Sequence, residues 1–122
     1  HMFAEVRQAM LLQRVVKGAD ALSAREALEM ATLGGAALLG RDDIGALAPG
    51  MAADLVGIDM DQVGFAGAQG DPLAALVFCA PPTIDLSIID GEIVAEDGRL
   101  ASLDLAALIE QHNALSLALT RS

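Results

Sequence analysis

Residues that could perform hydrolytic or metal chemistry are scarce in this sequence. The 122 residues include two histidines and one cysteine. His1, directly before Met2, is interpreted as a remnant of a purification tag, which leaves His112 and Cys79. A hydrolytic zinc ion needs about three protein ligands that converge on it, usually with histidine among them. The composition therefore predicts no zinc or iron site in this chain.

Carboxylates offer a second route to a metal site, because calcium and magnesium prefer oxygen ligands. The best candidate is the loop over residues 59–64, which begins like a calcium-binding loop with Asp59 and Asp61. However, Val63 stands where the third oxygen ligand belongs, and Gly70 replaces the closing glutamate. We therefore interpret these aspartates as ordinary loop carboxylates.

The candidate nucleophiles are Cys79, Ser87 and Ser116. Cys79 ends an apolar stretch without a neighbouring cation, which is typical of an inert core thiol. His112 lies on the apolar side of the last predicted helix, where a structural histidine is more common than a general base. The adjacent acids Asp42–Asp43 precede a turn and are interpreted as solvated caps. These residues predict no catalytic and no cofactor-binding site in the chain.

The composition restricts the partners of this protein. Hydrophobic residues make up 54% of the chain and aromatic residues only 2%, so little is available to stack on a nucleobase. The net charge of -10 repels a phosphate backbone, which argues against nucleic-acid binding. No apolar run approaches the ~20 residues of a membrane span, and a single cysteine suits a reducing cytoplasm. The cations are scattered along the chain: Arg7, Arg14, Lys17, Arg25, Arg41, Arg99 and Arg121.

Helices are predicted in the first third of the chain. The apolar periodicity predicts a helix over 2–17 that ends at Gly18. Ser23 and Glu26 form a capping-box pattern, which predicts a second helix over 23–39. The apolar stripe of the first helix comprises Phe3, Val6, Ala9, Met10, Gln13 and Val16.

Two glycines interrupt the second predicted helix. Gly34 and Gly35 each cost up to about 1 kcal/mol relative to alanine, so we expect another element to approach the helix backbone there. Gly40 is expected to end the helix. No Gly-Lys-Ser/Thr sequence follows, so these glycines do not form a phosphate-binding loop.

The middle of the chain alternates loops with short elements. The Pro49–Gly50 pair indicates a tight turn before a strand over 54–58, and residues 59–70 are irregular and glycine-rich. A helix is predicted over 71–79, capped by its first residue, with Pro81–Pro82 breaking it.

The last third carries the clearest strand pattern. Strands are predicted over 84–89 and 92–95, joined by a type I′ turn at Asp90–Gly91 and followed by a second turn at Asp97–Gly98. An aspartate then caps a final helix over 103–120. One side of that helix carries Leu105, Leu108, Ile109, His112, Leu115 and Leu119. The pattern predicts an α+β fold with about four helices and a small β unit.

One continuous segment carries a specific resemblance. Residues 31–59, ATLGGAALLGRDDIGALAPGMAADLVGID, resemble the Ala-Thr-x-x-Gly-Ala-x-x-Leu-Gly … Ile-Gly-x-Leu-x-x-Gly-x-x-Ala-Asp-Leu-Val signature near the carboxy end of metal-dependent amidohydrolases. Residues 71–80 and 84–100 look like the segments that follow it in that family. Residues 2–14 look like the helix after the last barrel strand in the branch with 8-oxoguanine deaminase, guanine deaminase and triazine hydrolases.

The resemblance implies a composite fold and a metal-dependent reaction. The family combines a (β/α)8 barrel with a β-sandwich built from both chain ends, and a barrel needs about 250 residues. In such enzymes zinc or iron activates water for attack on a ring carbon, which releases ammonia. The family's ligands, a His-x-His pair, two further histidines and an aspartate, lie upstream of residue 2, so none of them maps onto this chain.

The resemblance thus assigns structural tasks to this chain. Residues 2–40 correspond to barrel-type helices, residues 41–100 to part of the sandwich with the helix 71–79 inserted, and residues 103–120 to a terminal helix. The matching positions are Gly34 and Gly35 for close packing, Gly40 as a helix stop, Gly45 and Gly50 for turns, Asp54 as a loop anchor, and Asp90–Gly91 for the hairpin.

Three readings of the function follow. The first is the carboxy-terminal portion of an aminohydrolase that acts on a purine- or triazine-like heterocycle in the intact protein and is inactive alone. The second is an independently expressed, non-catalytic oligomerisation or binding module, and the third is a small enzyme that uses carboxylates. Because the family's amino-terminal strands are missing, we expect unpaired β edges and a homodimer or strand-exchanged oligomer.

Overall fold

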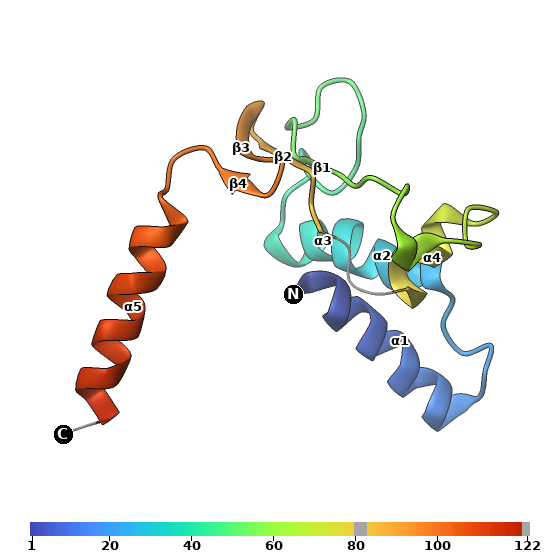
Figure 1. Cartoon of the computed structure of the whole chain (residues 1–122). Helices are drawn as coiled ribbons and strands as arrows, with labels where there is room; N and C mark the ends of the chain where they lie inside the picture. The colour runs from blue at the N-terminus through green and yellow to red at the C-terminus, as the bar shows by residue number, and fades with distance from the viewer. Residues whose placement is uncertain (80–82, 121–122) are drawn as a thin grey trace.

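The fold is described by a computed structural model for residues 1–79 and 83–120, and it agrees with the predicted α+β class (Figure 1). Four helical segments accompany one antiparallel sheet. The helices are α1 (Met2–Lys17), α2 (Ala24–Glu29) with its continuations η1 (Met30–Gly34) and α3 (Gly35–Leu39), α4 (Pro72–Phe78) and α5 (Leu105–Thr120). A short 3-10 turn, η2 (Val63–Phe65), lies in the loop before α4.

The predicted helix ends are confirmed by their caps. The Ser23 hydroxyl accepts the Glu26 N–H at 3.2 Å, and the Glu26 carboxylate accepts the Ser23 N–H at 2.7 Å. The carboxylate of Asp71 accepts the Ala74 N–H at 3.0 Å before α4. Asp104 does the same for α5. Each cap joins residues two or three positions apart, which explains why the sequence alone predicts them.

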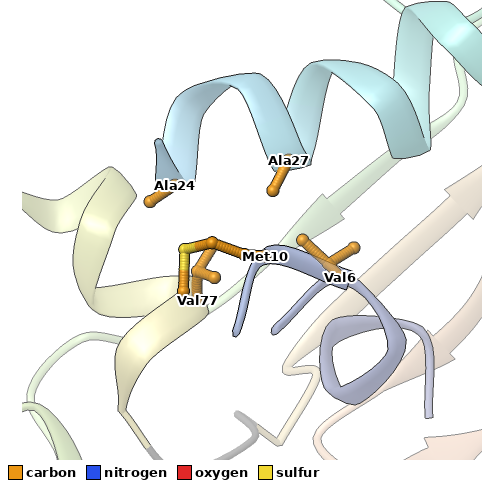
Figure 2. Close-up of a cluster of buried hydrophobic side chains, with 5 residues drawn as sticks. All are labelled: Val6, Met10, Ala24, Ala27 and Val77. Atoms are coloured by element: carbon orange, nitrogen blue, oxygen red, sulfur yellow. The ribbon is translucent and has the colours of Figure 1, made fainter. Parts of the chain in front are cut away.

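Helices α1, α2 and α4 surround a small core (Figure 2). Val6 and Met10 of α1 point toward Ala24 and Ala27 of α2 and Val77 of α4, and all five side chains are buried. The predicted stripe of α1 is thus only partly buried: its last member, Val16, is 75% exposed. α1 packs on α2 and α4 mainly through its first ten residues, because its second half extends past them (Figure 1).

The close approach expected at Gly34–Gly35 is found elsewhere, so that prediction is wrong within the described residues. A Cβ on Gly34 would meet only atoms of its own helix, and one on Gly35 would meet nothing within 4 Å. Gly45 instead passes against this helix: a Cβ there would lie 3.0 Å from the Thr32 carbonyl oxygen and 3.1 Å from the Ala36 Cβ. The glycine pair lies at the end of a π-helical turn, η1, which breaks the regular α-helical ladder.

The sheet has the order β1-β2-β3-β4, with every neighbouring pair antiparallel. Its strands are β1 (Leu55–Gly57), β2 (Leu86–Ile89), β3 (Glu92–Glu96) and β4 (Arg99–Leu100). A register shift between Ser87 and Ile88 interrupts the β2–β3 ladder. Among the described strands, the outer edges of β1 and β4 pair with no other strand, but these edges are only three and two residues long.

The predicted turns have the expected backbone conformation. Asp90 and Gly91 adopt φ angles of 52° and 79°, as a type I′ turn requires. Asp97 and Gly98 repeat this geometry. The loop before β1 is tied to the hairpin because the carboxylate of Asp54 accepts the Asp90 N–H at 2.8 Å. Asp54 therefore anchors this loop, as the resemblance implies. The predicted break at Pro81–Pro82 lies outside the described residues.

The last helix stands away from the rest of the chain (Figure 1). α5 follows the sheet through a short exposed connection and packs along no other helix or strand of the described residues. Within residues 105–120 every side chain is exposed, including six large apolar ones. None of the helices in the described part of the chain is long and apolar enough to cross a membrane.

Candidate functional site

The chemically capable residues of this chain lie on separate elements, except for His112 and Ser116, which are both on α5. His112 is exposed on α5 and Cys79 is half-buried at the end of α4. Ser87 is half-buried in β2, whereas Ser116 is exposed on α5, where its carbonyl accepts the Thr120 hydroxyl. Ser116 lies one helical turn after His112 on α5, but no hydrogen bond joins the two side chains in the described part of the chain, and Cys79 and Ser87 lie on other elements.

The loop carboxylates bind their own backbone. Asp59 accepts the N–H of Asp61 at 2.8 Å, and its own N–H is donated to the carboxylate of Asp85 at 2.6 Å. The side-chain amide of Gln62 donates to the Asp59 carbonyl at 2.9 Å. These bonds fold the loop onto the start of β2, because Asp85 directly precedes that strand.

Of the two adjacent acids Asp42 and Asp43, Arg41 forms an ion pair with Asp43. Arg41 holds Asp43 in a two-bond contact, with its Nε at 2.8 Å and its Nη2 at 2.6 Å from the two carboxylate oxygens. This hydrogen bonding lowers the pKa of Asp43 and raises the pKa of Arg41. Asp43 is thus an ion-pair partner rather than a solvated cap. Asp42 lies exposed beside it.

A zinc ion finds no suitable ligand set in the part of the chain that the structure describes. Among residues 1–79 and 83–120, no group of three or more His, Cys, Asp or Glu side chains could hold a metal ion. Several of the carboxylates are engaged singly by backbone N–H groups or by Arg41. The described residues do not provide the convergent ligands that a hydrolytic metal needs.

Two of the concave surfaces are open apolar grooves. The first has a volume of about 410 Å³ between α1 and α4, with Phe3, Leu11 and Val15 in its lining. The second, about 520 Å³, lies between the helix over 24–39 and β1. Their apolar linings are suited to packing against protein rather than to chemistry.

Two arginines that the sequence does not single out tie α1 to the segments packed beside it, and Arg7 also lines the first groove. Arg7 donates from Nη1 to the Cys79 carbonyl at 3.3 Å. Arg14 donates from Nε to the Leu22 carbonyl at 2.8 Å, and its guanidinium lies 5.2 Å from the centre of the Phe78 ring. Their positive charge on α1 could be read from the sequence, but their partners depend on how α1 and α4 pack.

The fold and the sequence place the chain in a known class of proteins. Residues 1–94 match the model of the amidohydrolase family. The chain belongs to this family.

Its relatives include deaminases. The chain is 46% identical over 119 residues to 8-oxoguanine deaminase of Pseudomonas aeruginosa, covering 98% of this chain and 26% of that protein. It is 39% identical over 104 residues to 5-methylthioadenosine/S-adenosylhomocysteine deaminase of Desulfitobacterium hafniense, covering 85% and 24%. The chain therefore spans about a quarter of the length of these relatives.

Solved structures support the same placement. A zinc-bound adenosine deaminase from Xanthomonas campestris matches with a TM-score of 0.91 and 31% identity, covering 99% of this chain and 28% of that chain. A mutant of atrazine chlorohydrolase from Arthrobacter aurescens TC1, complexed with zinc and atraton, matches with a TM-score of 0.85 and 33% identity, covering 93% and 26%. The relatives are thus deaminases and hydrolases that act on C–N and related bonds, and these two structures contain zinc.

Proposed function

We propose that this chain is the carboxy-terminal portion of a metal-dependent aminohydrolase that acts on non-peptide C–N bonds. In the intact protein the substrate is a purine- or triazine-like heterocycle, and the zinc or iron ion is held outside this chain. The observation that carries the proposal is the 46% identity to 8-oxoguanine deaminase over 98% of this chain, combined with coverage of only 26% of that protein.

The arrangement of the chain supports this role. Residues 2–40 are proposed to be barrel-type helices, residues 41–100 part of a β-sandwich with the helix 71–79 inserted, and residues 103–120 a terminal helix. The apolar groove on α1 and the exposed Leu39 and Val56 beside the second groove are surfaces that a barrel and further strands would cover. The chain's own residues then position neighbouring elements rather than reacting with substrate.

The metal content of the purified 122-residue chain tests half of this proposal. We expect less than about a tenth of an equivalent of tightly held zinc or iron, because a hydrolytic site needs about three convergent ligands. Elemental analysis after gel filtration measures this value. The control is the intact protein, which should retain its metal through the same column.

Catalysis tests the other half. The intact protein is expected to release ammonia from at least one of 8-oxoguanine, 5-methylthioadenosine and a hydroxytriazine, and the 122-residue chain from none. Chelator-sensitive ammonia release by the chain alone would overturn the proposal. The absence of a His-x-His motif from the reading frame upstream of Met2 would also overturn the proposal. That result would favour the non-catalytic module instead. No contact in the described residues specifically favours that module.

A further inference from the structure

The sequence contains two Asp-Gly pairs, and each of them forms a two-residue turn of the sheet. Asp90–Gly91 joins β2 to β3, and Asp97–Gly98 joins β3 to β4. The two turns have nearly the same backbone conformation, with φ angles of 52° and 48° at the aspartates and 79° and 72° at the glycines. The same dipeptide thus occurs twice in the same local geometry, but with different neighbours.

An aspartate that precedes a glycine can react with its own backbone. The glycine nitrogen attacks the carboxyl carbon of the aspartate, a C–N bond forms, and the carboxyl hydroxyl leaves with the amide proton as water. The reacting atoms belong to adjacent residues, which replaces a collision by a rotation of the backbone. Glycine favours the attack because it has no side chain and few forbidden conformations.

The product of this step is a five-membered imide. Water then adds to one of its two carbonyl carbons and breaks one C–N bond. One outcome is the original aspartate, and the other is isoaspartate, in which the main chain runs through the side-chain carbon. The two steps release and consume one water molecule, so the reaction needs no other reactant.

The first turn is tied to the loop before β1. The Asp90 N–H donates to the Asp54 carboxylate at 2.8 Å, and the Gly91 N–H donates to the Ala53 carbonyl at 3.3 Å. The nitrogen that would attack is therefore already engaged in a hydrogen bond. This turn also joins strands of four and five residues, so several contacts must break before it opens.

The second turn is held less firmly at the reacting bond. The Asp97 N–H donates to the Asp85 carbonyl at 2.8 Å, but the Gly98 N–H forms no hydrogen bond with the described residues. β4 is only two residues long and exposed, and one further bond, from the Ala101 N–H to the Val94 carbonyl, continues its pairing. Short, exposed pairing of this kind opens at a low cost in free energy.

From this contrast we infer that Asp97–Gly98 is a site of spontaneous isoaspartate formation in this chain, and that the fold protects Asp90–Gly91 from the same reaction. Isoaspartate adds one carbon to the main chain within a two-residue turn, so it disrupts the pairing of β4 with β3. The inference goes beyond the proposed catalytic role and does not depend on it, because the reaction is intramolecular and is tested on the 122-residue chain.

Ageing of the purified chain in warm neutral buffer tests the inference. A protease that cleaves before aspartate but not before isoaspartate reports the two sites separately, as the loss of cleavage before residue 97 or before residue 90. We expect isoaspartate at residue 97 to accumulate at least about tenfold faster. This is the factor that corresponds to one hydrogen bond to a charged group such as the Asp54 carboxylate. In urea that unfolds the chain, the two sites should react at similar rates.

Asp54→Ala is the matched variant, because it removes the acceptor of the Asp90 N–H and leaves the hydrogen bond of the Asp97 N–H in place. It should speed isoaspartate formation at residue 90 and leave the rate at residue 97 unchanged. Circular dichroism verifies that this variant is folded, and the wild-type rates test the inference even where it is not. Asp97→Glu should prevent the reaction at residue 97, since its longer side chain would have to close a six-membered ring.

Three results would overturn the inference. The first is a folded wild-type chain without isoaspartate at residue 97 after the unfolded chain has formed it. The second is a rate at residue 90 that equals or exceeds the rate at residue 97 in the folded chain. The third is the same ratio of rates in urea as in the folded chain, which would assign the difference to the flanking residues instead of the fold.

Discussion

At the residue scale, Gly45 is the position where backbone conformation and packing are most tightly coupled. Its φ angle is +91°, which residues with a side chain rarely adopt, and it lies against the helix over 24–39. Gly50 has almost the same φ angle, +88°, but a Cβ there would meet nothing within 4 Å. The pair separates the cost of backbone strain from the cost of a steric clash.

We expect Gly45→Ala to destabilise the chain by about 2–4 kcal/mol, because it adds overpacking to the left-handed strain. Gly50→Ala should cost about 1–2 kcal/mol from strain alone. Urea unfolding followed by circular dichroism measures both values. Equal losses for the two variants would contradict the close contact between Gly45 and Thr32.

The scarcity of reactive side chains could also be predicted at this scale, from the residue types alone. One native histidine and one cysteine are a property of the sequence, and the structure leaves His112 and Cys79 on separate elements. The Arg41–Asp43 ion pair was not predicted, although the two residues are only two positions apart. Nothing in the residue types decides whether such neighbours bend toward each other or toward solvent.

At the element scale, the capping box links the start of α2 to pH. The hydroxyl and the N–H of Ser23 both donate to Glu26, and these hydrogen bonds lower the pKa of the Glu26 carboxyl. A carboxyl whose folded pKa is depressed stabilises the fold above its unfolded pKa. That stabilisation is lost as the pH falls through the folded pKa.

We therefore expect Ser23→Ala to lower the Tm at neutral pH, and we expect the difference from the wild type to narrow as the pH falls through the folded pKa of Glu26. Thermal unfolding at a series of pH values measures this. Glu26→Gln is the control, because it keeps an acceptor for the cap but has no titrating group. A difference between Ser23→Ala and the wild type that is the same at every pH would contradict the assignment.

The packing of α1 on α2 and α4 depends on one side chain above the others. Met10 is fully buried at the centre of the helical cluster (Figure 2). Met10→Ala should cost about 2–5 kcal/mol because it leaves a cavity, whereas Met10→Leu should cost less than about 1.5 kcal/mol. Leu12→Ala, at an exposed position of the same helix, should stay within about 1 kcal/mol. Urea midpoints compare the three variants, and a Leu12→Ala loss as large as that of Met10→Ala would show that the core is misplaced.

At the scale of the whole molecule, more large apolar side chains are exposed than buried among the described residues. The buried hydrophobic residues are mostly alanine and valine, and Phe65 and Met10 are the largest side chains that are fully buried among the described residues. Many leucines and valines remain exposed along α1, the second groove and α5. Scattered exposed apolar residues are normal, but continuous faces of this size indicate surfaces that pack against protein. This is the physical basis for the proposed larger enzyme.

The sequence by itself determined the local features of this protein. The caps at Ser23, Asp71 and Asp104 and the turn at Asp90–Gly91 form between residues at most three positions apart, so their residue types are sufficient to predict them. The signature over residues 31–59 likewise predicted the family that the comparisons show.

Only the tertiary structure decided which surfaces meet. It placed the close backbone contact at Gly45 instead of Gly34–Gly35, left Val16 outside the core, and held α5 away from the other helices. These outcomes depend on contacts between segments distant in the sequence. Periodicity marks a helix face as apolar without naming the neighbour that covers it.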